Sequence, residues 1–295
     1  MSVGTEPALA LPAITVHRTL PVDGVEVFYR ETRPDRPDAP VLLLLHGFPS
    51  ASHQFRRLMD TLGRRYRLIA PDYPGFGHTR APEDFRYTFD RLADVVEAFT
   101  EQLQLPRHAL YVFDFGAPVG FRLALRHPER VTGLIVQNGN AYEEGLSPDA
   151  RALLTGQGPQ AEQAVREILT LDATRSQYLT GTADPTLVAP DGWLLDQWFL
   201  ERPERRRAQI ELFGDYHNNV AAYPNWQDWL RRHRPPTLIV WGSGDPFFLE
   251  PGARAYLRDV PDAELHLFVT GHFALEDHLP AIAPLIAGFL DRLPG

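Results

Sequence analysis

Three side chains that can do chemistry follow short apolar runs, in an order that suits covalent hydrolysis. Asp114 ends the run "YVFD", and the small residues Gly116 and Ala117 after it permit a sharp turn into a helix. Asp245 lies in "VWGSGDPFF" just after an apolar run, and His272 lies in "LFVTGHFALEDH" after the next one. A nucleophile, an acid and a histidine in this chain order, each at the carboxyl end of an expected strand, predict a catalytic triad.

An aspartate nucleophile narrows the reaction. A carboxylate that attacks an ester gives a mixed anhydride, whereas attack on a saturated carbon gives an alkyl ester that water can cleave. Asp114 therefore favours displacement at carbon, with His272 activating the water and Asp245 orienting and stabilising His272. For Asp114 alone, helix capping is the structural alternative. The competing histidines are less well placed, because His46 precedes the expected oxyanion turn and His278 comes one helical turn too late.

Backbone N–H groups are expected to hold the negative charge that develops during hydrolysis. In "HGFPSASHQF", the turn at Gly47 frees the N–H of Phe48 to point into the site, and the N–H of Phe115 supplies a second donor. Aromatic residues around the triad predict a mostly apolar pocket for a small hydrophobic substrate. Its expected lining residues are Phe247, Phe248, Phe273 and Trp193.

Alternating apolar runs and amphipathic segments predict the scaffold. The expected strands are 41–47, 66–72, 108–114, 132–138 and 237–242, with a helical pattern between the second and third. Their near-continuous apolarity is typical of a parallel sheet covered on both faces. Two more strands around Asp23 and Gly24 predict an antiparallel hairpin at the sheet edge.

The alternation stops after Asn138 and resumes at "PPTLIVWG". Residues 141–233 are helix-like and rich in aromatic residues, with no strong strand. We therefore expect a helical cap over residues 141–233, above the carboxyl end of the sheet where open α/β sheets bind ligands. Residues 1–140 and 234–295 would form the core.

Five segments resemble the α/β-hydrolase superfamily: "HGFPSASHQFRRLM", "APDYPGFGHT", "FDFGAPVGF", "VWGSGDPFF" and "TGHFALED". The resemblance is to the branch with an aspartate nucleophile, which includes epoxide hydrolases and haloalkane dehalogenases. It implies a mostly parallel eight-stranded sheet with a helical lid inserted after the sixth strand. One departure is Val112, which is larger than the glycine usual two residues before the nucleophile.

The resemblance also separates possible leaving groups. Haloalkane dehalogenases place Trp directly after the nucleophile and often Asn after the His-Gly pair, where this chain has Phe115 and Phe48. Fluoroacetate dehalogenases carry arginines directly after the nucleophile and again further along the helix, where this chain has Phe115 and Pro118. Dehalogenation is thus the second reading, with cap residues left to bind a halide: Trp193, Trp198 or His217.

Epoxide hydrolases use two cap tyrosines to protonate the opened ring. Tyr216 in "FGDYHNNV" resembles the second of them, and Tyr178 is the candidate for the first, with Tyr142 behind it. Epoxide hydrolysis is therefore the leading expectation. Acyl or C–C bond hydrolysis fits the aspartate poorly. A non-catalytic ligand-binding protein on the same fold is the alternative from another class.

Composition excludes other chemistry. The 295 residues contain no cysteine, and all 29 Lys+Arg residues are arginine, so thiolate and Schiff-base chemistry are impossible. The formal net charge of −9 argues against nucleic-acid binding. We expect no cofactor, no metal ion and no membrane span, and the opening residues show no signal-peptide pattern. These features predict a cytoplasmic protein, as a monomer or homodimer.

Overall fold

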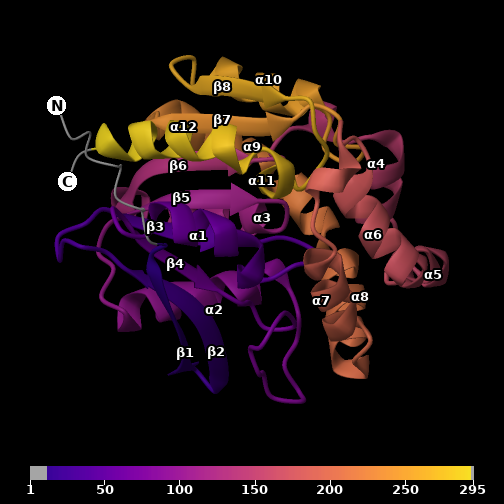
Figure 1. The fold of residues 1–295 in the computed structure, drawn as a ribbon. Helices are drawn as coiled ribbons and strands as arrows, with labels where there is room; N and C mark the ends of the chain where they lie inside the picture. The colour runs from indigo at the N-terminus through magenta and orange to yellow at the C-terminus, as the bar shows by residue number, and fades with distance from the viewer. Residues whose placement is uncertain (1–11, 294–295) are drawn as a thin grey trace, which may run out of the picture.

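The computed structural model describes residues 12–293, and its centre is one eight-stranded sheet (Figure 1). The spatial order is β1-β2-β4-β3-β5-β6-β7-β8. The strands are β1 (Ile14–Val22), β2 (Val25–Arg33), β3 (Val41–Leu45), β4 (Arg67–Pro71), β5 (His108–Phe113), β6 (Val131–Gln137), β7 (Thr237–Gly242) and β8 (Glu264–Phe268).

The sheet is parallel except at one edge. β1 pairs with β2 and β2 with β4 in antiparallel fashion, and every other neighbour is parallel. The predicted edge hairpin is confirmed: Asp23 and Gly24 have φ of 47° and 81°, the left-handed pair that a tight two-residue hairpin turn requires. All residues of β5 and β7 are buried, which explains why these strands read as unbroken apolar runs.

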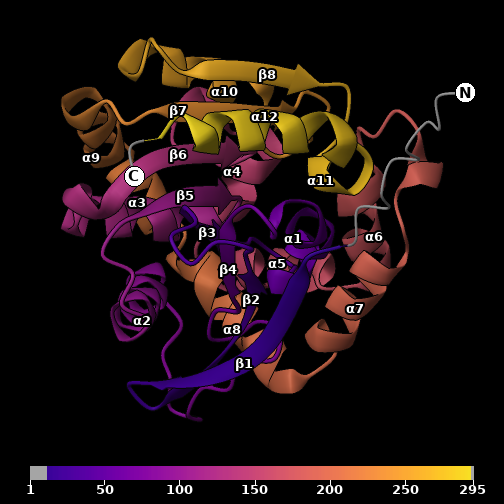
Figure 2. The ribbon, with the colours of Figure 1, turned by 60° about the vertical axis from the view of Figure 1, so that its left-hand side comes forward.

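Helices cover both faces of the sheet and bury two separate apolar clusters. One face is covered by α2 (Phe89–Gln102), α3 (Gly116–Arg126), α9 (His217–His233) and α10 (Glu250–Asp259). The other is covered by α1 (Arg56–Leu62), α11 (Ala274–Asp277) and α12 (Leu279–Asp291), and Figure 2 shows α1 and α12 over this face. No helix within residues 12–293 combines the length and apolarity needed to cross a membrane.

The segment between β6 and β7 forms a helical layer beyond the carboxyl ends of the strands (Figure 1). Its helices are α4 (Pro148–Thr155), α5 (Pro159–Ile168), α6 (Leu171–Leu179), α7 (Asp191–Leu200) and α8 (Pro203–Asp215). We call α4–α8 the cap. The mostly parallel eight-stranded sheet with an inserted helical cap matches the predicted architecture.

Helix α9 differs from the cap helices, although the sequence analysis counted it with them. It leads back to the start of β7, and its Trp226 ring stacks on Phe121 of α3 at 5.1 Å and 10°. Because β6 and β7 are parallel neighbours, the chain must return to the opposite end of the sheet between them. Helix α9 makes this return and packs with the core.

Candidate active site

The backbone at Asp114 forms a strained turn between β5 and α3. Asp114 has φ of 49°, in the left-handed region that residues with a side chain seldom adopt. Glycines make room for it: a Cβ on Gly47 would lie 2.3 Å from the Asp114 Cβ, and one on Gly116 would lie 2.1 Å from the Leu45 carbonyl oxygen. This is the geometry of a nucleophile elbow, which exposes a side chain at the carboxyl end of a strand.

Val112 fits this elbow because the helix provides the space. A Cβ added to Gly120 of α3 would lie only 2.5 Å from Val112 Cγ1. The small residue that lets strand and helix approach is therefore on α3. The departure from the family pattern at Val112 leaves the turn intact.

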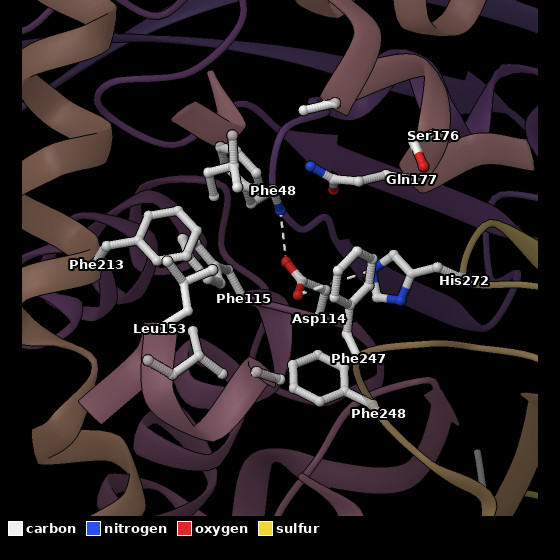
Figure 3. Close-up of a pocket in the computed structure, with 14 residues that line it drawn as sticks. Phe48, Asp114, Phe115, Leu153, Ser176, Gln177, Phe213, Phe247, Phe248 and His272 are labelled. Carbon is white, nitrogen blue, oxygen red and sulfur yellow. Dashed lines mark hydrogen bonds and ion pairs between the residues drawn. The ribbon is translucent and has the colours of Figure 1, made fainter. Parts of the chain in front are cut away.

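The structure brings the three predicted triad residues together. His272 Nδ1 is 2.6 Å from Asp245 Oδ2, and His272 Nε2 is 3.8 Å from Asp114 Oδ2. The first distance is a hydrogen bond and the second is too long for one. His272 thus pairs with the acid Asp245 through Nδ1. Its other side faces the candidate nucleophile Asp114 (Figure 3).

Asp245 is fixed by donors on both of its oxygens. Asn138 Nδ2 donates to Oδ2 at 2.7 Å, and the amides of Phe247 and Phe248 donate to Oδ1 at 2.8 and 3.2 Å. Asn138 is itself held, because its Oδ1 accepts from the Gly242 amide at 2.9 Å. The sequence analysis missed Asn138, whose only signal was its place directly after β6.

Burial and charge shift the pKa values of the two central groups. Burial raises the pKa of Asp114 to about 6, although the charge on His272 and the amides of Phe115 and Phe48 oppose the rise. Burial by itself lowers the pKa of His272, but the charge and hydrogen bond of Asp245, with the charge of Asp114, raise it above its usual value.

The predicted oxyanion donors point at Asp114. The Phe48 amide donates to Asp114 Oδ1 at 2.6 Å (Figure 3), and the Phe115 amide also stabilises the carboxylate. Oδ1 is therefore the oxygen placed to carry negative charge if water attacks an ester on Asp114. Oδ2, on the side of His272, is the oxygen left to attack a substrate.

Asp114 opens into a cavity of about 250 Å³ between the core and the cap. The core contributes Phe48, Asp114, Phe115, Phe247, Phe248 and His272. The cap contributes Ala150, Leu153, Leu154, Ile168, Ala173, Ser176, Gln177 and Phe213. The predicted apolar lining is present at Phe247 and Phe248. Phe273 and Trp193 do not line this cavity; Phe273 stacks on Tyr178 at 3.8 Å, and Trp193 packs against the same tyrosine.

Tyr178, the expected first cap acid, is not among the residues that line the cavity. Its hydroxyl donates to Asp196 Oδ2 at 2.6 Å, and Asp196 Oδ1 lies 3.0 Å from His53 Nε2. This buried network joins the cap helices α6 and α7 to the core near Ser50, whose hydroxyl lies 3.3 Å from His53 Nε2. The hydroxyl of Tyr178 is thus committed to holding the cap on the core.

Tyr216, the expected second cap acid, lies behind Phe115. The two ring centroids are 5.6 Å apart, and Tyr216 is not part of the cavity wall. Its buried hydroxyl interacts with the hydroxyl of Tyr223, and burial, followed by the charges of Tyr223 and Asp114, raises the pKa of Tyr216. Tyr142, the reserve candidate, donates to Asp259 at 2.7 Å.

The cap residues that do reach the cavity escaped the sequence analysis. Gln177 and Ser176 provide its polar groups, and Phe213 packs edge-on against Phe48 at 5.0 Å. No motif marks these positions. The nearest signal was the candidate Tyr178, one residue from Gln177.

The remaining candidate groups lie elsewhere. His46 stacks on Tyr73 at 4.1 Å and accepts from the Tyr73 amide, and burial lowers the pKa of His46 to about 4, so it stays neutral in the core. Glu97, Glu101 and His127 approach one another closely enough to hold a cation. Arg126 and His127 already pair with Glu97 at 2.7 and 2.5 Å, so the cluster is internally neutralised.

A model of the "alpha/beta hydrolase fold" family matches residues 40–279, which include every residue of the candidate triad. The chain belongs to this family. Among curated relatives, this α/β-hydrolase is 40% identical to the uncharacterized hydrolase YNR064C of Saccharomyces cerevisiae, over 90% of this chain and 94% of that one. It is 39% identical to a haloalkane dehalogenase of Bradyrhizobium diazoefficiens, over 92% of this chain and 93% of the relative.

Solved structures show the same fold. The haloalkane dehalogenase DbeA from Bradyrhizobium elkani USDA94 superposes with a TM-score of 0.79 at 23% identity, over 94% of this chain and 98% of that one. A meta-cleavage product hydrolase from Pseudomonas fluorescens IP01 superposes with a TM-score of 0.77 at 21% identity, over 93% and 97%. Because hydrolases with different reactions share the scaffold, the reaction must be argued from the site.

Proposed function

We propose that this α/β-hydrolase cleaves its substrate in two steps, through an alkyl ester on Asp114. One observation carries the proposal. A carboxylate stands at the nucleophile elbow, with Oδ1 bound by the Phe48 amide and Oδ2 facing the cavity 3.8 Å from His272 Nε2. A carboxylate in that place forms a stable ester only with a saturated carbon.

The two steps use the two sides of the site. Asp114 Oδ2 attacks the carbon and the bond to the leaving atom breaks, which gives the ester. His272 Nε2 then takes a proton from water, which attacks the ester carbon of Asp114, and the amides of Phe48 and Phe115 hold the oxyanion. Asp245 stabilises the protonated His272, and the alcohol leaves as the ester breaks.

An epoxide is the substrate class we propose, in line with the apolar walls. Neither Phe48 nor Phe115 carries a side-chain N–H group, so these two side chains beside Asp114 cannot donate to a released halide. An isolated anion in an apolar cavity costs much free energy. The alkoxide from a ring opening can be neutralised by a proton, whereas a halide keeps its charge. The small cavity favours a small hydrophobic epoxide, hydrolysed to a diol.

Displacement of a halide is the second candidate. Relatives named haloalkane dehalogenase share 39% and 30% of their residues with this chain. The hydroxyls of Tyr178 and Tyr216 also stand off the cavity wall, which leaves ring opening without the two expected acids. A halide needs no proton, so this arrangement suits it better than an epoxide in that one respect.

The covalent intermediate distinguishes these reactions. In His272→Gln the base is lost, so the ester on Asp114 should persist and can be weighed by intact-protein mass spectrometry. The variant is incubated separately with an aryl epoxide, a bromoalkane and fluoroacetate. A gain equal to the whole epoxide supports ring opening, and a gain of the alkyl group without bromine supports dehalogenation.

The double variant Asp114→Asn/His272→Gln is the control, because it should gain no mass with any substrate. A folded His272→Gln protein that also gains none would reject the alkyl-ester mechanism and favour a ligand-binding role.

A further inference from the structure

The cap wall of the cavity has two polar side chains, and only one is uncommitted. The Ser176 hydroxyl lies 3.0 Å from the hydroxyl of Thr180 and hydrogen-bonds with it. The Gln177 amide makes no hydrogen bond to any residue of the part of the chain that the structure describes. Gln177 is nevertheless only 7% exposed. The other residues of this wall are apolar.

The Gln177 amide keeps some accessible surface, and that surface faces the cavity, so cavity water can hydrogen-bond to it until a substrate displaces the water. Figure 3 shows that the amide of Gln177 points from α6 into the cavity, toward the space between Phe48 and Asp114. An unpaired amide held in this place indicates a partner that the substrate brings.

The position of Gln177 indicates which part of the substrate would hydrogen-bond with its amide. Displacement at a saturated carbon runs in line, so the leaving atom departs on the side opposite the nucleophile. Asp114 attacks from the core wall, and Gln177 belongs to the cap wall across the cavity. With Ser176 already bonded, the Gln177 amide is the free polar group among the cap residues that line the cavity.

We propose that the Gln177 side-chain N–H donates a hydrogen bond to the leaving atom as Asp114 attacks. The inference rests on the proposed alkyl-ester mechanism and adds the group that recognises its leaving atom. It fits substrates whose leaving atom accepts a hydrogen bond, an epoxide oxygen or a halogen. Gln177 would thus interact with the leaving atom, which is the role that the sequence analysis expected of the adjacent residue Tyr178.

The step balances without proton transfer from the amide. The bond from Asp114 Oδ2 to carbon forms, the bond from carbon to the leaving atom breaks, and its electron pair goes to that atom. A halide then leaves as the anion. An epoxide oxygen takes a proton from water, and the hydroxide so formed is neutralised by the proton that His272 gains during hydrolysis of the ester.

The nature of the donor gives this role a distinct signature. An amide does not titrate in the working pH range, so its contribution to ester formation should not change with pH. A tyrosine acid would lose its effect as its phenol ionises, and burial raises the pKa of both Tyr178 and Tyr216 above the usual value. A halide has departed before the ester is cleaved, so with a haloalkane the cleavage step should be unaffected, whereas the oxygen of an opened epoxide stays on the ester as a hydroxyl.

The test measures ester formation alone, in the His272→Gln background, by mass spectrometry against time. Gln177→Met keeps the size of the side chain and removes the amide. We expect it to slow ester formation about 10- to 100-fold with an epoxide or a bromoalkane, whichever forms the adduct, by the same factor from pH 7 to pH 10. In the presence of His272 and with a bromoalkane, single-turnover cleavage of the ester should keep its rate.

The matched control is Gln209→Met in the same background. Gln209 is a buried glutamine of α8 that donates to the Gly75 carbonyl at 3.1 Å and does not line the cavity. The Gln209→Met substitution should change the rate of ester formation less than threefold. If Gln177→Met does not fold, Gln177→Glu keeps the shape and replaces the donor with an acceptor, and should slow the step at least as much.

The outcomes separate the two proposals. Ester formation at the parental rate in folded Gln177→Met or Gln177→Glu overturns the role of Gln177 and leaves the alkyl-ester mechanism standing. An equal loss of the rate of ester formation in Gln209→Met also overturns the role of Gln177. No adduct in the parental His272→Gln protein overturns the mechanism, and the inference with it.

Discussion

The core wall and the cap wall of the cavity hold their polar groups in different ways. On the core wall, Asp114 is held by the Phe48 amide, and His272 is held by Asp245. On the cap wall, the Gln177 amide has no hydrogen-bond partner among residues 12–293. The contrast teaches that bond-making groups are preorganised by the sheet, whereas the cap leaves a group open for the substrate.

Replacing Asp114 by asparagine should cause the largest loss of activity among substitutions on the core wall. Asparagine tolerates the left-handed backbone but is no nucleophile, so kcat/KM should fall by a factor on the order of 10⁴ or more. Because the pKa of Asp114 is raised to about 6, stability falls as pH rises from about 4 to about 6, and the carboxylate costs about 3 kcal/mol at pH 7. The variant should therefore melt higher at pH 7.

Melting curves and steady-state rates check this prediction together. The gain in melting temperature should shrink as the pH falls from 7 toward 3, where the folded and unfolded carboxyl groups are both largely protonated. Residual activity within tenfold of the parent would remove Asp114 from the reaction.

The second test removes a hydrogen bond that orients the core wall, at Asn138, which does not line the cavity. Asn138→Gly keeps a residue suited to φ of 41° but removes the donor to Asp245. With its orienting acid less fixed, His272 should cleave the ester more slowly, and kcat should fall about 10- to 100-fold. Rapid-quench measurement should find ester formation unchanged, and an equal slowing of both steps would contradict the assignment.

The third test uses pH. Asp114 must be ionised to attack, so kcat/KM should fall on the acid side with an apparent pKa near 6. At pH 5 it should be about tenfold below its plateau at pH 7 to 8. A profile that stays flat down to pH 4.5 would show that the free enzyme does not depend on this ionisation.

Among these substitutions, Tyr178→Phe should have the smallest effect on activity. It tests whether this cap hydroxyl is structural or catalytic. The structure commits its hydroxyl to Asp196, so Tyr178→Phe should change kcat/KM less than about threefold and lower the free energy of unfolding by about 1–3 kcal/mol. A catalytic acid would show a loss of about 10²–10⁴ instead. Urea unfolding and initial rates distinguish the two.

The sequence predicted the core wall because a few local rules determine it. Apolar runs indicate buried strands, and a polar residue directly after a parallel strand must lie at the ligand-binding edge. Asp114, Asp245 and His272 all follow strands in this way. Their convergence therefore needed only the strand order that the family resemblance implied. Asn138 obeys the same rule and could have been included.

The cap wall could not be predicted because it depends on the rotation of α6 about its axis. Consecutive helical residues point about 100° apart, so an error of one residue in the phase exchanges Gln177 for Tyr178. Hydrophobic periodicity would normally give that phase. Here Thr174, Gln177 and Tyr178 are all buried, so polar residues occupy the buried face and the pattern fails.

The connection between β6 and β7 also bears on how such a protein changes over generations. The cap enters and leaves the scaffold between two adjacent parallel strands, and α9 completes the return independently of α4–α8. The whole cap is therefore an insertion at a single point of the scaffold. The sequences and lengths of its helices can change during evolution while the turn at Asp114 keeps its shape. Grafting this segment onto a related scaffold should therefore transfer the cavity wall and the proposed leaving-atom donor Gln177 together, while Asp114, Asp245 and His272 stay with the recipient core.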